Sequence, residues 1–115
     1  MHTLDPSLTL DRRQLRDITL DDEELMREVL TALIEDTSRQ IELLQSAIRE
    51  QDPERCKRLA HYCKGACANV GANAAASVLR RMEEEALSRD FVQCEESLAA
   101  LGRELERLRT EAETL

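Results

Sequence analysis

The side chain in this sequence best suited to chemistry is His61, within the stretch LAHYCKGACANVGA that runs from Leu59 to Ala72. Lys64 follows His61 by three residues and Gly65 follows it by four. Imidazole is a good nucleophile near neutral pH because its unperturbed pKa is about 6.5. The spacing predicts one helix that presents a nucleophile, a cation and a glycine close together on the same face.

Helical periodicity indicates that this face is turned outward. At about 100° per residue, the residues on the face of His61, or beside it one turn earlier, are basic or small: Lys57, Arg58, Lys64, Gly65 and Ala68. The opposite face is an apolar stripe of the kind that faces a core: Cys56, Leu59, Cys63, Ala66, Cys67 and Val70. A glycine inside a helix costs about 1 kcal/mol relative to alanine. Gly65 therefore either admits a large partner to the imidazole or serves close helix packing.

The run AHYCKGACANVGA resembles the signature of histidine-containing phosphotransfer (HPt) domains, in which A-H-x-x-K-G precedes small residues and a second glycine. The matching positions are Ala60, His61, Lys64, Gly65, Ala68, Asn69, Gly71 and Ala72. Cys63 and Cys67 depart from the family's usual leucine and small residue. Both departures lie on the inward face, so they concern packing. The resemblance spans nearly the whole chain.

This resemblance implies a phosphorelay carrier protein of two-component signalling. His61 would accept a phosphoryl group on its outer ring nitrogen and exchange it with an aspartate of a response-regulator receiver domain. The expected partners are such a receiver, a hybrid histidine kinase, or both, and the protein is expected to be a monomer. An alternative is a non-catalytic helical adaptor that binds a receiver or kinase domain without phosphotransfer. An exposed apolar groove would favour the adaptor, whereas the sequence shows one inward stripe per helix.

The resemblance also implies roles for the neighbours of His61. Lys64 would offer its ammonium to the phosphoryl oxygens, and Gly65 would clear the path for the receiver domain. The remaining expected docking residues provide positive charge or flat apolar contact: Lys57, Arg58, Ala68 and Ala72.

We expect this chain to be a carrier and not an enzyme. Phosphoryl transfer depends on in-line geometry and charge stabilisation, and the sequence has no acid cluster for Mg²⁺ near His61, no glycine-rich nucleotide loop and no second candidate base. The partner would supply the metal and the acceptor aspartate. No cofactor and no metal ligand of its own are expected.

Composition favours an all-α fold. The 115 residues include one Phe, one Tyr, no Trp and only five Gly and Pro together, which is typical of helical bundles with aliphatic cores. A net charge of −8 argues against nucleic-acid binding, which needs a basic surface. No apolar run approaches the roughly 18 residues of a membrane span, and the N-terminus lacks the apolar core of a secretory signal. We therefore expect a cytoplasmic protein that does not enter a membrane.

The four cysteines allow two interpretations. Cys56, Cys63, Cys67 and Cys94 could in principle bind zinc, but no C-x-x-C pair is present. Free cysteine is among the most frequently buried residue types. We therefore expect all four to fill the core.

The predicted architecture is an antiparallel up-down four-helix bundle with a short extra N-terminal helix. A flexible tail is expected over 1–7 and a single domain over 8–115. The expected helices cover residues 8–17, a stretch of about 28 residues ending near Gln51, and residues 53–70, 73–88 and 91–112. Thr19 or Asp21 is expected to cap the second helix, Asp52 the third, and Ser88 or Asp90 the last.

Apolar periodicity assigns an inward stripe to each of these helices. The first would bury Leu10, Leu15 and Ile18, and the second would bury Leu25, Val29, Leu33, Thr37, Ile41, Leu44 and Ile48. The stripe of the last helix also fits a two-stranded coiled coil, although the bundle is preferred.

Overall fold

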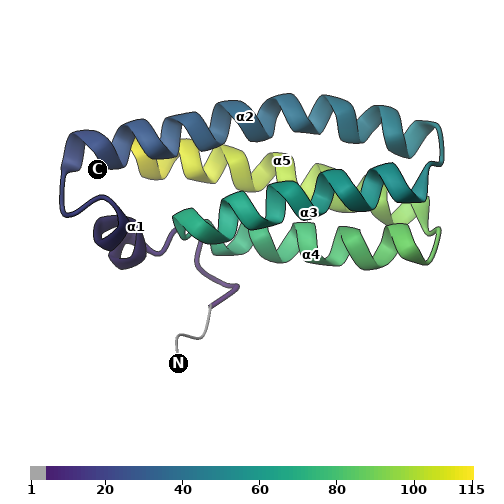
Figure 1. Cartoon of the computed structure of the whole chain (residues 1–115), viewed down its shortest axis with the longest axis horizontal. Helices are drawn as coiled ribbons and strands as arrows, with labels where there is room; N and C mark the ends of the chain where they lie inside the picture. The colour runs from purple at the N-terminus through teal and green to yellow at the C-terminus, as the bar shows by residue number, and fades with distance from the viewer. Residues whose placement is uncertain (1–4) are drawn as a thin grey trace.

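The structure, a computed structural model, describes residues 5–115, and this range contains five helices and no strand. They are α1 (Arg12–Ile18), α2 (Glu23–Arg49), α3 (Pro53–Val70), α4 (Asn73–Leu87) and α5 (Phe91–Glu113). The four long helices run alternately up and down (Figure 1). α2 and α4 each pack against both α3 and α5, while α1 packs against α2 and α3 at one end. The predicted bundle is confirmed, and the stripe of α5 belongs to it.

Aspartates begin four of the helices. The side chains of Asp11, Asp22, Asp52 and Asp90 each accept a hydrogen bond from the backbone N–H three residues further on. Such a cap stabilises a helix by about 1 kcal/mol relative to alanine. The cap of α2 is thus Asp22, not Thr19 or Asp21. The first helix begins at Arg12, later than predicted, because Leu8 instead hydrogen bonds through its carbonyl to the N–H of Ala74.

The ends of the helices are set by backbone conformation. α2 stops at Arg49, two residues before the predicted end, because Gln51 adopts a left-handed φ of 54°. α3 ends as predicted at Val70, and it is capped by Gly71, whose φ is 93°. An added Cβ on Gly71 would lie 2.8 Å from the carbonyl oxygen of Asp11. The Gly71 carbonyl also accepts a 2.8 Å hydrogen bond from the N–H of Asp11, so the N-terminal segment is fastened to the α3–α4 corner.

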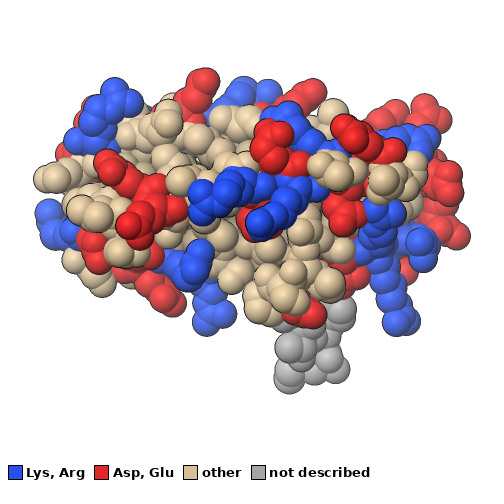
Figure 2. Space-filling view, turned by 180° about the vertical axis from the view of Figure 1, so that it is seen from behind, with Lys and Arg blue, Asp and Glu red and all other residues tan. Residues whose placement is uncertain are grey.

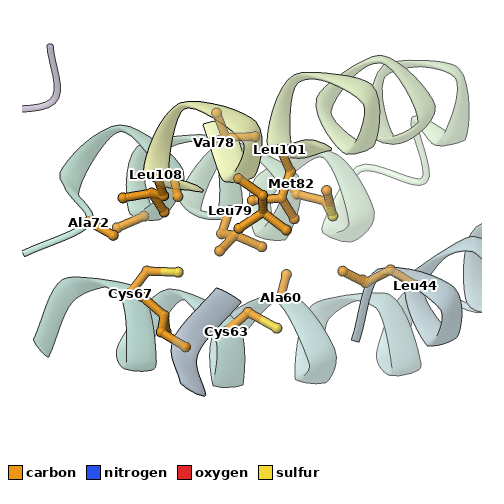
Figure 3. Packing of buried hydrophobic residues seen from close by; sticks show 14 of the residues in the cluster. Leu44, Ala60, Cys63, Cys67, Ala72, Val78, Leu79, Met82, Leu101 and Leu108 are labelled. Atoms are coloured by element: carbon orange, nitrogen blue, oxygen red, sulfur yellow. The ribbon is translucent and has the colours of Figure 1, made fainter. Parts of the chain in front are cut away.

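The core is a layer of leucine, alanine and cysteine side chains enclosed by α2 to α5. Cys63, Cys67 and Ala60 of α3 face Leu79 and Met82 of α4 across this layer (Figure 3). Cys94 is buried on α5, so the expected burial of all four cysteines is observed. Burial raises the pKa of Cys63 to about 12, of Cys67 to about 11 and of Cys94 to about 12.

Two of the predicted stripes need correction. Ile18 is 51% exposed, and Leu25 is 39% exposed while Met26 and Leu30 are buried instead. A spacing of four residues rotates a stripe by about 40° per step, so a stripe that starts at Leu25 drifts off the buried face. The tail predicted over 1–7 falls partly outside the described residues, and its flexibility stays a prediction. Asp5 to Ser7 form a turn in which Ser7 hydrogen bonds to the Asp5 carboxylate.

Charge is mixed over the face turned away from the viewer in Figure 1. Lysine and arginine side chains lie beside aspartates and glutamates over much of that face (Figure 2). The net charge of −8 is therefore not gathered there into one single-sign field. Along the described chain, no helix combines the length and the apolar character needed to cross a membrane.

Candidate functional site

His61 lies in the middle of α3 on its outer face. Its side chain is 69% exposed, whereas Ala60 and Cys63 on either side of the turn are buried. The inward stripe of α3 therefore fixes which way the imidazole points, because rotating the helix would expose the core cysteines. The predicted outward placement of His61 is observed.

One carboxylate oxygen connects His61 and Lys64. Oε1 of Glu83 on α4 lies 3.3 Å from Nδ1 of His61 and 2.8 Å from Nζ of Lys64. The Glu83 side chain is only 15% exposed. An ionised carboxylate can only accept hydrogen bonds, so in this contact Nδ1 carries the proton. In the neutral ring, the lone pair then resides on Nε2.

Glu83 was not identified from the sequence, where α4 residues outside the apolar stripe were expected to face outward. The signal that could have found it is the helical hairpin formed by α3 and α4. His61 and Glu83 lie eleven residues before and after Ala72, at the corner. In an antiparallel hairpin, residues equally distant from the turn lie level with each other, so the two side chains meet.

Gly65 is exposed, one turn beyond His61. An added Cβ at Gly65 would meet no heavy atom within 4 Å in the described structure, the backbone of α3 itself aside. Packing against a neighbouring helix therefore does not require this glycine. Gly65 instead borders a hollow between α3 and α4, which it shares with Lys64 and Ala68.

The expected docking residues separate into two groups. Arg58 is exposed, and Lys57 and Ala68 are half-buried, so all three reach the surface of α3. Ala72, in contrast, is 0% exposed and points into the core (Figure 3). Its docking role, which the family resemblance implied, is wrong, because Ala72 follows the end of α3 at Val70 and is enclosed by the core.

Tyr62 is a further surface residue that the sequence argument left out. Its ring, next to His61 in the chain, is 54% exposed. Its hydroxyl donates a 2.9 Å hydrogen bond to Oδ2 of Asp36 on α2. This bond and the charge of the same carboxylate raise the pKa of Tyr62. The exposed aromatic ring is therefore held on the α2 side of α3, whereas His61 lies on the α4 side.

The described residues contain no group of three or more His, Cys, Asp and Glu side chains arranged to hold a metal ion. The buried thiols have raised pKa values, which disfavours the thiolate form that binds metals. The groups that the structure brings together at the site are an imidazole, an ammonium and a carboxylate.

Comparisons with known proteins identify the family of the chain and relate its fold to a solved structure. The family model of the Hpt domain matches residues 28–111. The fold is similar to the crystal structure of histidine-containing phosphotransfer protein B (HptB) from Pseudomonas aeruginosa PAO1, with a TM-score of 0.84, 22% sequence identity and 94% of each chain covered. No curated protein matches the sequence. Members of the matched family exchange phosphoryl groups with kinases and response regulators. The chain belongs to the Hpt domain family and is a phosphorelay carrier of two-component signalling.

Proposed function

We propose that His61 is the phosphoacceptor of this carrier and that Nε2 is the reacting atom. The observation that supports this assignment is the contact between Nδ1 and Glu83 on a side chain that is 69% exposed. Because Nδ1 keeps its proton and donates a hydrogen bond to the carboxylate, the nucleophilic lone pair of the neutral ring is on the other ring nitrogen. Nε2 makes no hydrogen bond within the described residues, so it is available to a partner.

Phosphoryl exchange then proceeds by in-line displacement. The Nε2 lone pair attacks the phosphorus of an aspartyl phosphate on the receiver domain, the P–N bond forms, and the P–O bond to the aspartate breaks. The aspartate leaves as a carboxylate. In the opposite direction its oxygen attacks the phosphohistidine, and the imidazole leaves. We assign Mg²⁺ binding to the acidic pocket of the receiver, so this chain would not be an enzyme in its own right.

Lys64 would stabilise the phosphoryl group. Its Nζ already lies beside the ring, because it shares the Glu83 oxygen with Nδ1. The side chain is 29% exposed, which leaves the ammonium within reach of an incoming group. A phosphoryl group on Nε2 would compete with Glu83 for this cation.

Docking of the receiver would use the surface of α3 around Gly65. The open space at Gly65 admits a backbone or side chain close to the imidazole. Arg58 and Lys57 lie three and four residues before His61, so they add positive charge on its side of the helix. This charge would favour encounter with an acidic receiver pocket.

We further propose that the protein is a monomer in the cytoplasm. The four cysteines are free thiols, a state that suits a reducing compartment. The proposed partners are a receiver domain, a hybrid histidine kinase or both, because the chemistry of His61 is the same with each.

The experiment that tests this proposal follows the phosphoryl group. A panel of receiver domains from the same genome is phosphorylated with labelled acetyl phosphate, mixed with the full chain and resolved on a gel. The wild-type chain is expected to take up an acid-labile label, and His61→Gln is expected to remain unlabelled with an unchanged circular dichroism spectrum. A label retained by His61→Gln would remove His61 from the mechanism. A receiver that binds without passing its label would support the adaptor function instead.

A further inference from the structure

The hollow beside the phosphotransfer residues has an unusual lining. It has a volume of about 430 Å³ and lies between α3 and α4, two helices that run side by side (Figure 1). The polar residues that line it are Lys64, Asn73, Ser77 and Arg80. All four side chains can donate hydrogen bonds, and among residues 5–115 no carboxylate lines the hollow.

The Asn73 side chain, which lines the hollow, lacks hydrogen-bond partners among residues 5–115 of the free protein. The residue is 2% exposed, and neither its Oδ1 nor its Nδ2 has a hydrogen-bond partner within the described residues. An unpaired buried amide destabilises a fold. Asn73 also does not cap its own helix, since the N-cap position of α4 is Ala72 and no side chain caps it. The amide therefore has no evident structural function.

One charge in the hollow, that of the Arg80 guanidinium, is also uncompensated. Arg80 is exposed, and in the part of the chain that the structure describes it forms no ion pair. The ammonium of Lys64 is held by Glu83 at the edge of the hollow. The apolar part of the wall comes from Gly65 and Ala68 of α3, Ala76 of α4 and Pro6 of the N-terminal segment. The occupant that fits these surroundings has a methylene stem and an anionic, hydrogen-bond-accepting end.

We propose that the hollow is a socket for one acidic side chain of the receiver domain. The carboxylate would pair with the Arg80 guanidinium and accept a hydrogen bond from Nδ2 of Asn73, while its stem lies over Gly65 and Ala68. The Asn73 amide can rotate toward this group without breaking a hydrogen bond, because it makes none. The inference rests on the proposed function, since the occupant belongs to the receiver that reacts with His61. The socket would fix the orientation of that receiver and contribute to partner choice.

Binding measurements test the socket separately from phosphoryl transfer. The receiver domain that binds the wild-type chain most tightly is activated with beryllofluoride and titrated calorimetrically against the full chain. Arg80→Glu is expected to raise Kd by about tenfold or more, and Asn73→Leu by about fivefold to tenfold. The matched control is Arg81→Glu, which makes the same charge change one residue further along α4 at an exposed position outside the hollow. Its Kd is expected to change less than twofold.

Thermal unfolding and a charge reversal in the partner complete the test. Asn73→Leu is expected to unfold at the same temperature as wild type or higher, because no hydrogen bond is lost. Changing the acidic residue of the receiver to arginine is expected to restore binding to Arg80→Glu. The socket proposal would be overturned if Arg80→Glu and Asn73→Leu both left Kd unchanged. It would also be overturned if Arg81→Glu weakened binding as much as Arg80→Glu. The same titrations can be made with His61→Gln, which is expected to bind the receiver without accepting its phosphoryl group. The role of the hollow in binding can therefore be decided even if His61 proves not to be the phosphoacceptor.

Discussion

The three glycines of this chain should respond to substitution in three different ways. Gly65 and Gly102 lie inside helices, and an added Cβ would meet nothing within 4 Å at either position. Only helix propensity then changes, so Gly65→Ala and Gly102→Ala should each stabilise the fold by about 1 kcal/mol. For a domain of this size, that corresponds to a rise of about 4 °C in Tm. Gly71→Ala should lower Tm by at least as much, because its φ of 93° and the Asp11 carbonyl at 2.8 Å both oppose a side chain.

Phosphoryl transfer separates the two stabilising positions. Gly65→Gln should keep a raised Tm yet slow transfer by about 100-fold, because a long side chain would displace the receiver from the imidazole. Gly102→Gln on α5 is the matched control and should transfer at the wild-type rate. Calorimetry and label transfer to a phosphorylated receiver measure the two effects. A lower Tm for Gly65→Gln would contradict the open space at this position. Transfer as fast as that of Gly102→Gln would contradict the access role of Gly65.

Three further changes probe the site and the core. Glu83→Ala should slow transfer by about fivefold, because a hydrogen bond of about 1 kcal/mol no longer selects the reactive ring tautomer; an unchanged rate would show that His61 is oriented without it. Lys64→Gln should reduce the maximum rate of transfer by about tenfold with the fold intact, and an effect confined to receiver affinity would contradict this role. Since burial raises the pKa of Cys63 and Cys94 to about 12, unfolding should become easier as pH rises above about 9, where unfolded thiols ionise first. Iodoacetamide at pH 8 should modify the cysteines only after denaturation, which mass spectrometry would detect.

Local chemistry explains why α3 could be predicted so closely. The pair Asp52-Pro53 caps and begins the helix, and Gly71 caps its end. Each of these signals acts within a few residues. The same is true of the outward placement of His61, which follows from the cysteines on the opposite face. No alternative pairing of helices would change these features.

Features that depend on how the helices pair were harder to predict. Glu83 reaches His61 only because α3 and α4 form a level hairpin, and the buried face of α2 depends on two neighbouring helices at once. The unpaired amide of Asn73 depends on the absence of an acceptor nearby, which no local pattern encodes. Ala72 was misplaced because its docking role came from the family resemblance, whereas its burial after the α3–α4 turn depends on how the helices pack.

The shared oxygen of Glu83 has a consequence for how long a phosphoryl group would stay on this protein. A dianion arriving at the imidazole would come close to a like charge that is already bound to the nearest ammonium. Repulsion of this kind raises the free energy of the loaded form relative to the empty one. Such a site would favour rapid transfer of the phosphoryl group to a partner over its retention on the imidazole. The Glu83 carboxylate would thereby limit the lifetime of the phosphorylated protein.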